Sequence, residues 1–223
     1  MNWDRLSRVT APAVKPLTLD AAKAHLRVDS SDQNATIQEK IDAAIASVDG
    51  PRGIGICMIS QQWRLTLDGF RDRAFFDLCD GAYGYAYRGR RGDLRNIPIP
   101  LGPVISVDEV AYTALDGTDQ VLVAGTDYKF SAGIDPAIIF PPFGTFWPIA
   151  IPEPASVRIK FTAGFGPAAS DVPGDLIGAL ELVVGHLFAN REDVVGTAAR
   201  VSPVELPKGA GTVFDRYRCG LFG

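Results

Sequence analysis

The segment of residues 156–192 constrains the fold most, because it predicts a half-buried strand followed closely by a long helix. Val157, Ile159 and Phe161 alternate with polar residues, and this period of two is typical of a strand with one buried face. Gly164 and the glycine two residues later interrupt the extended pattern. The strand is therefore expected to end at a glycine turn.

The helix that follows begins with residues suited to a first turn. Asp171 can accept hydrogen bonds from free backbone N–H groups, and Pro173 is tolerated where no N–H group is needed. The residues that then recur at helical spacing on one apolar face are Leu176, Ile177, Leu180, Val183, Val184, Leu187 and Phe188. This pattern predicts an amphipathic helix over about residues 173–191.

Two further helices are expected near the N-terminus. Thr18 is a suitable N-cap residue, and apolar spacing predicts helices over about residues 18–28 and 34–49. Residues 1–16 contain two prolines and are expected to form an extended arm.

The pattern changes to β-structure over about residues 59–163. The stretch QQWRLTLDGF alternates from residue 61, residues 104–113 predict another strand, and Asp116-Gly117 is suited to a hairpin turn. Residues 70–96, which are rich in glycine, tyrosine and arginine, predict a long insertion loop.

The order of these elements predicts an α+β fold. A small α-helical bundle would carry a β-rich insertion between its second and third main helices. The central domain would span residues 17–193, with the N-terminal arm before it and a C-terminal tail at residues 194–223, which would form a second extended arm.

Composition excludes several classes of protein. The chain has 22 basic and 26 acidic residues, and its net charge of -4 argues against a general nucleic-acid binder. Its cysteines, Cys57, Cys79 and Cys219, form no C-x-x-C pair and are odd in number, so synthesis in a reducing cytoplasm fits best. No apolar run predicts a transmembrane helix, and the N-terminus does not resemble a secretory signal.

Few groups suggest catalysis. The two histidines, His25 and His186, fall within predicted helices, where a packed structural role is the ordinary interpretation. The sequence has neither the compactly spaced ligands of a zinc site nor a Walker, G-x-S-x-G or EF-hand pattern. We therefore expect no enzyme activity, no cofactor and no metal.

One basic cluster lies at the end of the predicted insertion loop, interleaved with tyrosines. It comprises Arg88, Arg90, Arg91 and Arg95. Basic groups beside aromatic rings can follow a nucleic-acid backbone. The alternatives are a solvated loop and a loop that meets an acidic neighbouring subunit. If the protein forms a ring, these arginines are candidates for a loop that faces DNA in the channel.

The C-terminal tail is less polar than a free tail should be. Its apolar and basic residues are Phe214, Arg216, Tyr217, Arg218, Leu221 and Phe222. Aromatic and arginine side chains are enriched at the energetic centres of protein interfaces. The tail is expected either to dock on the protein's own core or to bind a partner.

Four stretches in sequence order resemble the head–tail connector (adaptor) proteins of long-tailed phages and gene transfer particles. They are LTLDAAKAHLRVD, QQWRLTLDGF, IPLGPVISVDEVAYTALDGTDQVL and VRIKFTAGFGPAASDVPGDLIGALELVVGHLFANRE. The resemblance covers most of residues 17–193. The sequence departs from the family pattern in the long loop at residues 70–96 and in the extended N-terminal arm.

The resemblance implies a structural protein of the virion at the head–tail junction. Such a protein would form a ring of roughly a dozen subunits beneath the portal, with head-to-tail contacts between copies. It would extend the DNA channel, reach the portal protein with its C-terminal tail, and dock a tail-side stopper or head-completion protein.

Two other classes of function stay open from the residues alone. A β-sandwich module that binds a ligand or receptor would explain the β-rich block but not the three helices, and it predicts a stable monomer. An enzyme would need titratable groups gathered in a cleft.

Overall fold

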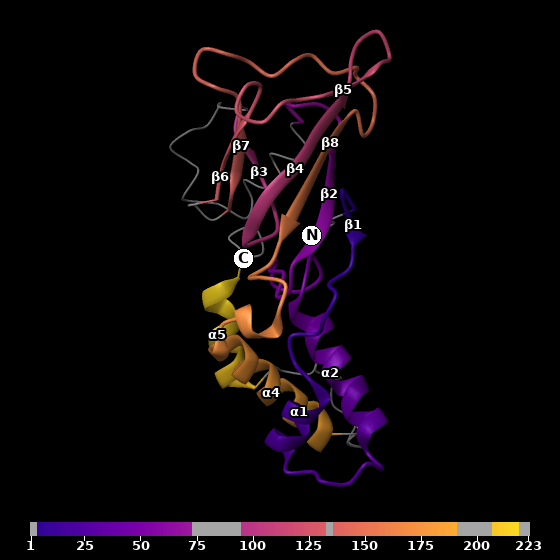
Figure 1. The fold of residues 1–223 in the computed structure, drawn as a ribbon, viewed down its shortest axis with the longest axis vertical. Coiled ribbons are helices and arrows are strands. Elements are labelled where there is room, and N and C mark those ends of the chain that lie inside the picture. The colour runs from indigo at the N-terminus through magenta and orange to yellow at the C-terminus, as the bar shows by residue number, and fades with distance from the viewer. Residues whose placement is uncertain (1–3, 73–94, 133–135, 191–206, 219–223) are drawn as a thin grey trace, which may run out of the picture.

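The computed structural model describes residues 4–72, 95–132, 136–190 and 207–218. The molecule is elongated, with helices gathered at one end and β-sheets at the other (Figure 1). Neither end is continuous in sequence, because the β-structure is inserted between the second and third helices. The predicted α+β fold with a β-rich insertion is therefore confirmed.

The larger sheet has five antiparallel strands in the order β1-β2-β8-β4-β5. Their bounds are β1 Leu6–Thr10, β2 Gln61–Leu67, β8 Val157–Ala163, β4 Val104–Thr113 and β5 Asp119–Val121. The alternation predicted for β2 and β8 is seen in both, since every second side chain is buried. Strand β8 lies between β2 and β4 and pairs with both along its length.

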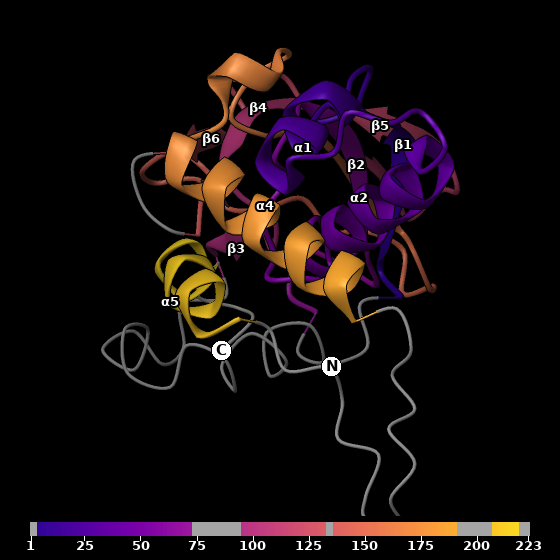
Figure 2. The same ribbon diagram turned by 90° about the horizontal axis from the view of Figure 1, so that it is seen from below.

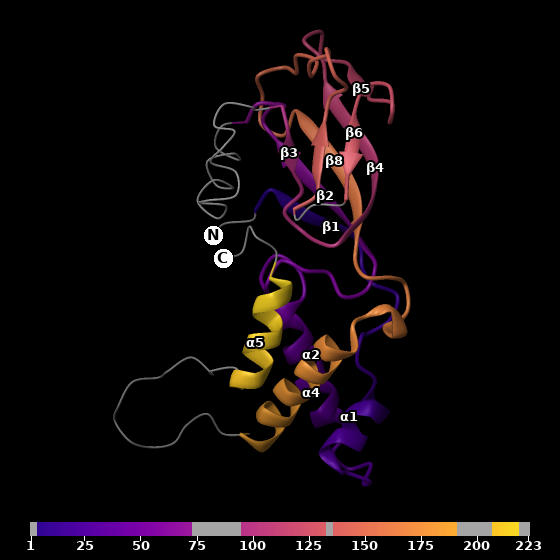
Figure 3. The same cartoon turned by 90° about the vertical axis from the view of Figure 1, so that its left-hand side faces the viewer.

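The smaller sheet has three strands in the order β3-β7-β6, with bounds Ile97–Pro98, Ile138–Phe140 and Lys129–Ser131. It packs on one face of the larger sheet (Figure 3). The two sheets share an apolar core, in which Trp63 and Phe161 of the larger sheet are buried together with Ile139 of the smaller one. The β-structure is thus a small sandwich.

The helical end contains α1 (Leu19–Leu26), α2 (Asn34–Val48), α4 (Gly174–Ala189) and α5 (Lys208–Tyr217), and the 3-10 turn η2 (Ala169–Asp171) precedes α4. A second apolar core holds these helices together through buried residues such as Ile37, Ile41, Leu176 and Leu180. No helix within the described ranges is long and apolar enough to cross a bilayer.

Local signals explain several boundaries. Thr18 caps α1 as predicted, because its Oγ1 accepts a hydrogen bond of 3.2 Å from the backbone N–H of Ala21. Gly164 follows β8 with a φ of 144°, and a Cβ atom there would lie 2.6 Å from the backbone nitrogen of Ser60. Only glycine therefore fits where the chain leaves the sheet for the helical end.

The structure differs from the expected extended arm at the C-terminal end of the chain, and at the N-terminal end it adds strand pairing to an extended segment. Part of the N-terminal arm forms the edge strand β1, which pairs with β2. Residues 208–217 of the predicted tail form helix α5. Asp171 lies in η2, where its Oδ2 accepts from the N–H of Ala168, so α4 begins three residues later than that carboxylate.

Candidate interaction surfaces

Large apolar side chains are exposed at the end of the molecule farthest from the helices. They lie on the β4–β5 turn and on the loop of residues 141–156, and both segments run across this end in Figure 1. Phe143 is fully exposed, and the exposed fractions of Ile149, Phe146 and Leu115 are 72%, 69% and 62%. We call these four residues the apolar tip.

The backbone joins the two segments of the apolar tip. Ala114 and Ala150 form an antiparallel bridge, and the N–H of Ile151 donates to the carbonyl of Thr113 over 2.9 Å. Leu115 and Ile149 flank this bridge. Their side chains are therefore held next to each other by main-chain pairing.

Contacts beneath the apolar tip anchor the rest of the loop. Trp147, next in sequence to Phe146, is buried and stacks on Phe70 with a centroid separation of 4.7 Å. Its Nε1 donates to the carbonyl of Arg95 over 2.7 Å, and the Arg95 guanidinium donates to the carbonyl of Thr145 over 2.8 Å. The guanidinium carbon also lies 5.3 Å from the centre of the Phe146 ring. The tip is therefore presented on a fixed loop.

Carboxylates border the apolar tip. The Thr118 hydroxyl and N–H donate to Asp116, and these hydrogen bonds lower the pKa of Asp116. Hydrogen bonds from the Thr113 hydroxyl and the Arg158 guanidinium lower the pKa of Asp119. Both carboxylates thus stay ionised at neutral pH. The surface therefore combines apolar side chains with the charge of Asp116, whereas Asp119 is paired with Arg158 at 2.6 Å.

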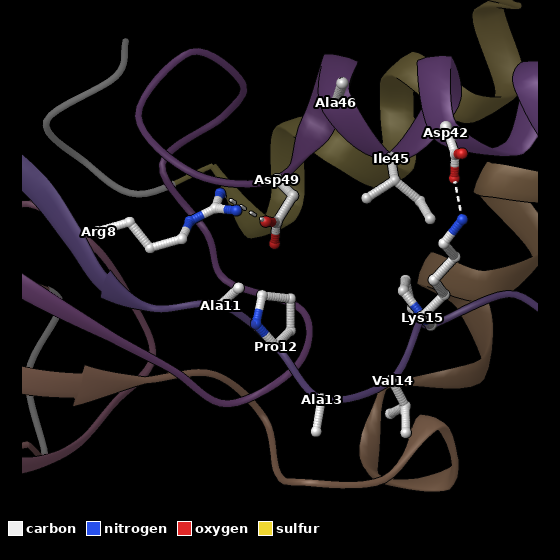
Figure 4. Close-up of a pocket in the computed structure, with 11 residues that line it drawn as sticks. Arg8, Ala11, Pro12, Ala13, Val14, Lys15, Asp42, Ile45, Ala46 and Asp49 are labelled. Atoms are coloured by element: carbon white, nitrogen blue, oxygen red, sulfur yellow. Dashed lines mark hydrogen bonds and ion pairs between the residues drawn. The ribbon is translucent and has the colours of Figure 1, made fainter.

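A second candidate surface is a pocket of about 430 Å³ between the N-terminal arm and α2. Figure 4 shows its charged ends, where Arg8 lies beside Asp49 and Lys15 lies beside Asp42. The lining between them is largely apolar and comprises Ala11, Pro12, Ala13, Val14, Pro16, Ile45 and Ala46. Such a pocket can receive an apolar side chain, but its ion pairs already satisfy its charges.

Asp49 at one end of this pocket also joins the helical end to the sheet. Its carboxylate accepts from the N–H of Met58 over 2.8 Å and from the Gln61 side-chain amide over 2.9 Å. Arg8 lies 3.9 Å away and stacks over Trp63. Burial raises the pKa of Asp49, and the hydrogen bonds from Gln61 and Met58 oppose this effect. No motif in the sequence predicts this role of Asp49.

The predicted partner-binding tail divides into buried and exposed residues. Phe214 is only 1% exposed and belongs to the helical core, so its ring is not free for a partner. Tyr217 donates to Asp175 over 2.8 Å, which raises the pKa of Tyr217, and Arg216 pairs with the same carboxylate at 3.2 Å. Arg218 pairs with Asp215. Leu221 and Phe222 lie outside the described residues.

The structure describes little of the predicted DNA-channel loop. Arg88, Arg90 and Arg91 lie outside the described residues, and Arg95 anchors the loop beneath the tip. His25 lies 3.6 Å from Glu181 across α1 and α4, and His186 contacts Asn190 one turn later. Within the described ranges, no cluster of three or more His, Cys, Asp or Glu residues could hold a metal ion.

Comparisons with known proteins identify similar folds. A chain in the virion of a native gene transfer agent (GTA) particle is 22% identical, with a TM-score of 0.66, over 96% of this chain and 94% of that chain. A chain in the neck of an empty GTA particle, computed with C6 symmetry, gives the same values. A chain in the neck of a native GTA particle, computed with C12 symmetry, is 23% identical, with a TM-score of 0.61.

No protein-family model matches the chain, and no curated protein matches it in sequence. The likeness to the GTA chains is thus one of fold, and it extends over nearly the whole of both chains. The elongated arrangement of helical end and β-sandwich is therefore an architecture that a virus-like particle also uses.

Proposed function

We propose that this protein is a structural component of a phage-like particle, a head–tail connector that forms a ring at the neck. The observation that carries the proposal is the end-to-end likeness of its fold to chains of GTA particles, two of them described as the neck. The sequence resemblance to adaptor proteins favours the same assignment independently.

The surface chemistry supports an assembled rather than a solitary protein. Soluble monomers rarely gather exposed aromatic and aliphatic side chains on a rigid loop without a binding role. In this proposal the apolar tip docks a neighbouring ring component. The ring contains roughly a dozen head-to-tail copies, surrounds the DNA channel, and joins the portal protein to a tail-side stopper or head-completion protein. The protein acts by binding and has no catalytic role.

The first experiment is negative-stain electron microscopy of the protein mixed with the portal protein encoded beside it. A second ring stacked on the narrow end of the portal is the expected result, and its rotational symmetry gives the number of subunits. Bare portal rings beside folded monomers of this protein would overturn the proposal and favour a ligand-binding or receptor-binding module. In that case the pocket between the N-terminal arm and α2 would be the first site to test.

A further inference from the structure

Helix α5 packs mainly on α4, and Tyr217 near its C-terminal end also meets the Phe165 ring edge-on, with the ring centroids 6.1 Å apart. Helix α5 lies along one side of α4, whereas α1 and α2 lie on the other side (Figure 2). Two sets of contacts fix its direction. A Cβ atom added at Gly209 would lie 3.7 Å from Leu182, and the far end of α5 contacts Asp175 through Arg216 and Tyr217. The two helices are therefore antiparallel, and α5 packs along the flank of α4. We call the part of the α4 surface that α5 covers, which includes Asp175 and Leu182, the α4 groove.

The sequence of α5 makes a weak helix on its own. It has ten residues, with glycine at positions 209 and 211 and no side-chain hydrogen bond at its N-cap. A helix of this length is marginal in water, and glycine is a much poorer helix former than alanine. Burial of Ala210 and Phe214 against the α4 groove must supply the difference. Helix α5 thus depends on the α4 groove for its stability, and the α4 groove of another copy of the chain would provide the same contacts.

The chain between α4 and α5 is longer than this antiparallel pair requires. Helix α4 extends seven residues beyond Leu182, which is about 10 Å. Antiparallel helices are commonly joined by about 2–8 residues, whereas residues 190–207 supply 18. Fully extended, that length could reach about 60 Å, roughly twice the diameter of a small domain. The covalent connection therefore does not restrict α5 to the α4 groove of its own chain.

We infer that in the assembled ring α5 occupies the α4 groove of the adjacent copy of this chain. This inference rests on the ring proposed above. In a closed head-to-tail ring every groove receives one helix, so no contact seen in the single subunit is lost. A long connection lowers the advantage of docking within one chain, and the neighbour's groove is then at a comparable effective concentration. The exchanged helices would link each subunit to the next.

The test mixes two single-cysteine proteins before assembly on portal rings. One carries Leu182→Cys and the other Gly209→Cys, both with Cys79 and Cys219 replaced by serine and with the buried Cys57 retained. A short bismaleimide then joins thiols that are in contact. A covalent dimer of the two variants forms only if α5 of one copy lies on α4 of another. Random mixing would place a cross-linkable pair at about a quarter of the interfaces of a cyclic ring.

Two controls define the readout. A chain with both cysteines, kept as a free monomer, should form an internal cross-link, which confirms that the positions meet. Leu182→Cys mixed with Thr118→Cys, at the opposite end of the molecule, should give no dimer in the ring.

Rings that electron microscopy confirms but that yield no covalent dimer of the two variants would overturn the inference and leave the proposed function intact. Rings assembled from the chain with both cysteines then show where α5 lies. Internal cross-links in them would mean that α5 stays on its own chain, and no cross-link would mean that it has left the α4 groove for the portal. Failure to form any ring would overturn the proposed function together with the inference.

Discussion

Two aromatic segments of this molecule carry similar side chains and differ completely in burial. On α5, Phe214 is 1% exposed and Ala210 is fully buried, because their four-residue spacing puts both on the face toward α4. On the loop of residues 141–156, Phe143 is fully exposed and Phe146 is 69% exposed.

The difference shows that apolar content alone does not identify an interaction surface. The tail could bury its apolar side chains because helical spacing gathers them on one face. The loop is interrupted by Pro141, Pro142 and Gly144, so no regular period directs Phe143 and Phe146 toward the core, although Trp147 of the same loop is buried. Exposed apolar groups therefore remain where the backbone is irregular yet anchored.

The largest expected effect comes from two adjacent residues within the loop. Trp147→Ala removes the buried ring that stacks on Phe70 and should lower the free energy of unfolding by about 3–5 kcal/mol. Phe146→Ala, one position away and mostly exposed, should change it by less than about 0.5 kcal/mol. Urea unfolding, monitored by far-ultraviolet circular dichroism so that the signal does not depend on tryptophan fluorescence, measures the free energy of unfolding of both variants. Similar losses of unfolding free energy in the two variants would contradict the assignment of Trp147 as buried and Phe146 as exposed.

The next effect tests whether α5 is held by its buried face. Phe214→Ala should reduce the free energy of docking α5 by up to about 3–5 kcal/mol, while global stability falls less because α5 can open separately. Hydrogen exchange of α5 amides is the measurement. The exposed Phe143→Ala variant is the matched control and should leave α5 protection unchanged. Protection that survives the loss of Phe214 would count against this account of the helix.

A third prediction concerns the apolar tip in assembly. Replacing Phe143 and Ile149 together by serine should leave the fold within about 0.5 kcal/mol of the parent, since both are exposed. If the tip is the energetic centre of a docking surface, the loss should reach about 2 kcal/mol or a thirty-fold weaker affinity for the neighbouring component. Sedimentation with portal rings and tail-side partners measures this. Undiminished association would mean that the apolar tip is not part of the proposed interface.

The smallest expected effect concerns Asp49, which joins the helical end to the larger sheet through Met58 and Gln61. Because burial raises the pKa of Asp49, the folded protein binds more protons than the unfolded chain between the two pKa values. The stabilising contribution is complete below the unfolded value and is lost as pH rises through the folded value.

Asp49→Asn does not titrate, so the parent protein should lose stability relative to this variant as pH rises from the ordinary aspartate value of 3.8 through the raised pKa. Above that window the difference should be constant. Unfolding by urea at a series of acidic pH values measures the slope. A difference that is flat across the whole acidic range would contradict the raised pKa.

Periodicity in the sequence predicted the bounds of strand β4 and of helices α1, α2 and α4 closely. The strand at residues 104–113 has the predicted bounds, and the three predicted helices begin and end within two residues of those observed. These elements have long apolar patterns that both local geometry and burial support.

The remaining elements were harder to predict, for physical reasons. Gly209 and Gly211 disfavour a helix, so the sequence alone did not predict α5. Tertiary contacts stabilise this helix. Strand β1 has one buried side chain followed by exposed ones, so its pairing with β2 leaves no alternating signal. The apolar tip and the carboxylate of Asp49 owe their roles to segments far apart in sequence, which no local pattern records.

The position of β8 at the centre of the larger sheet has a consequence for synthesis. Strand β2 pairs with β8 in register from Gln61 and Ala163 to Leu67 and Val157, so its partner leaves the ribosome about ninety residues later. Helices α1 and α2 likewise cannot complete their apolar core until α4, which ends at Ala189, has been synthesised. Neither end of the molecule can close before most of the chain has been made. A chain that terminates before Val157 thus lacks both the central strand of the larger sheet and the helix that completes the helical core.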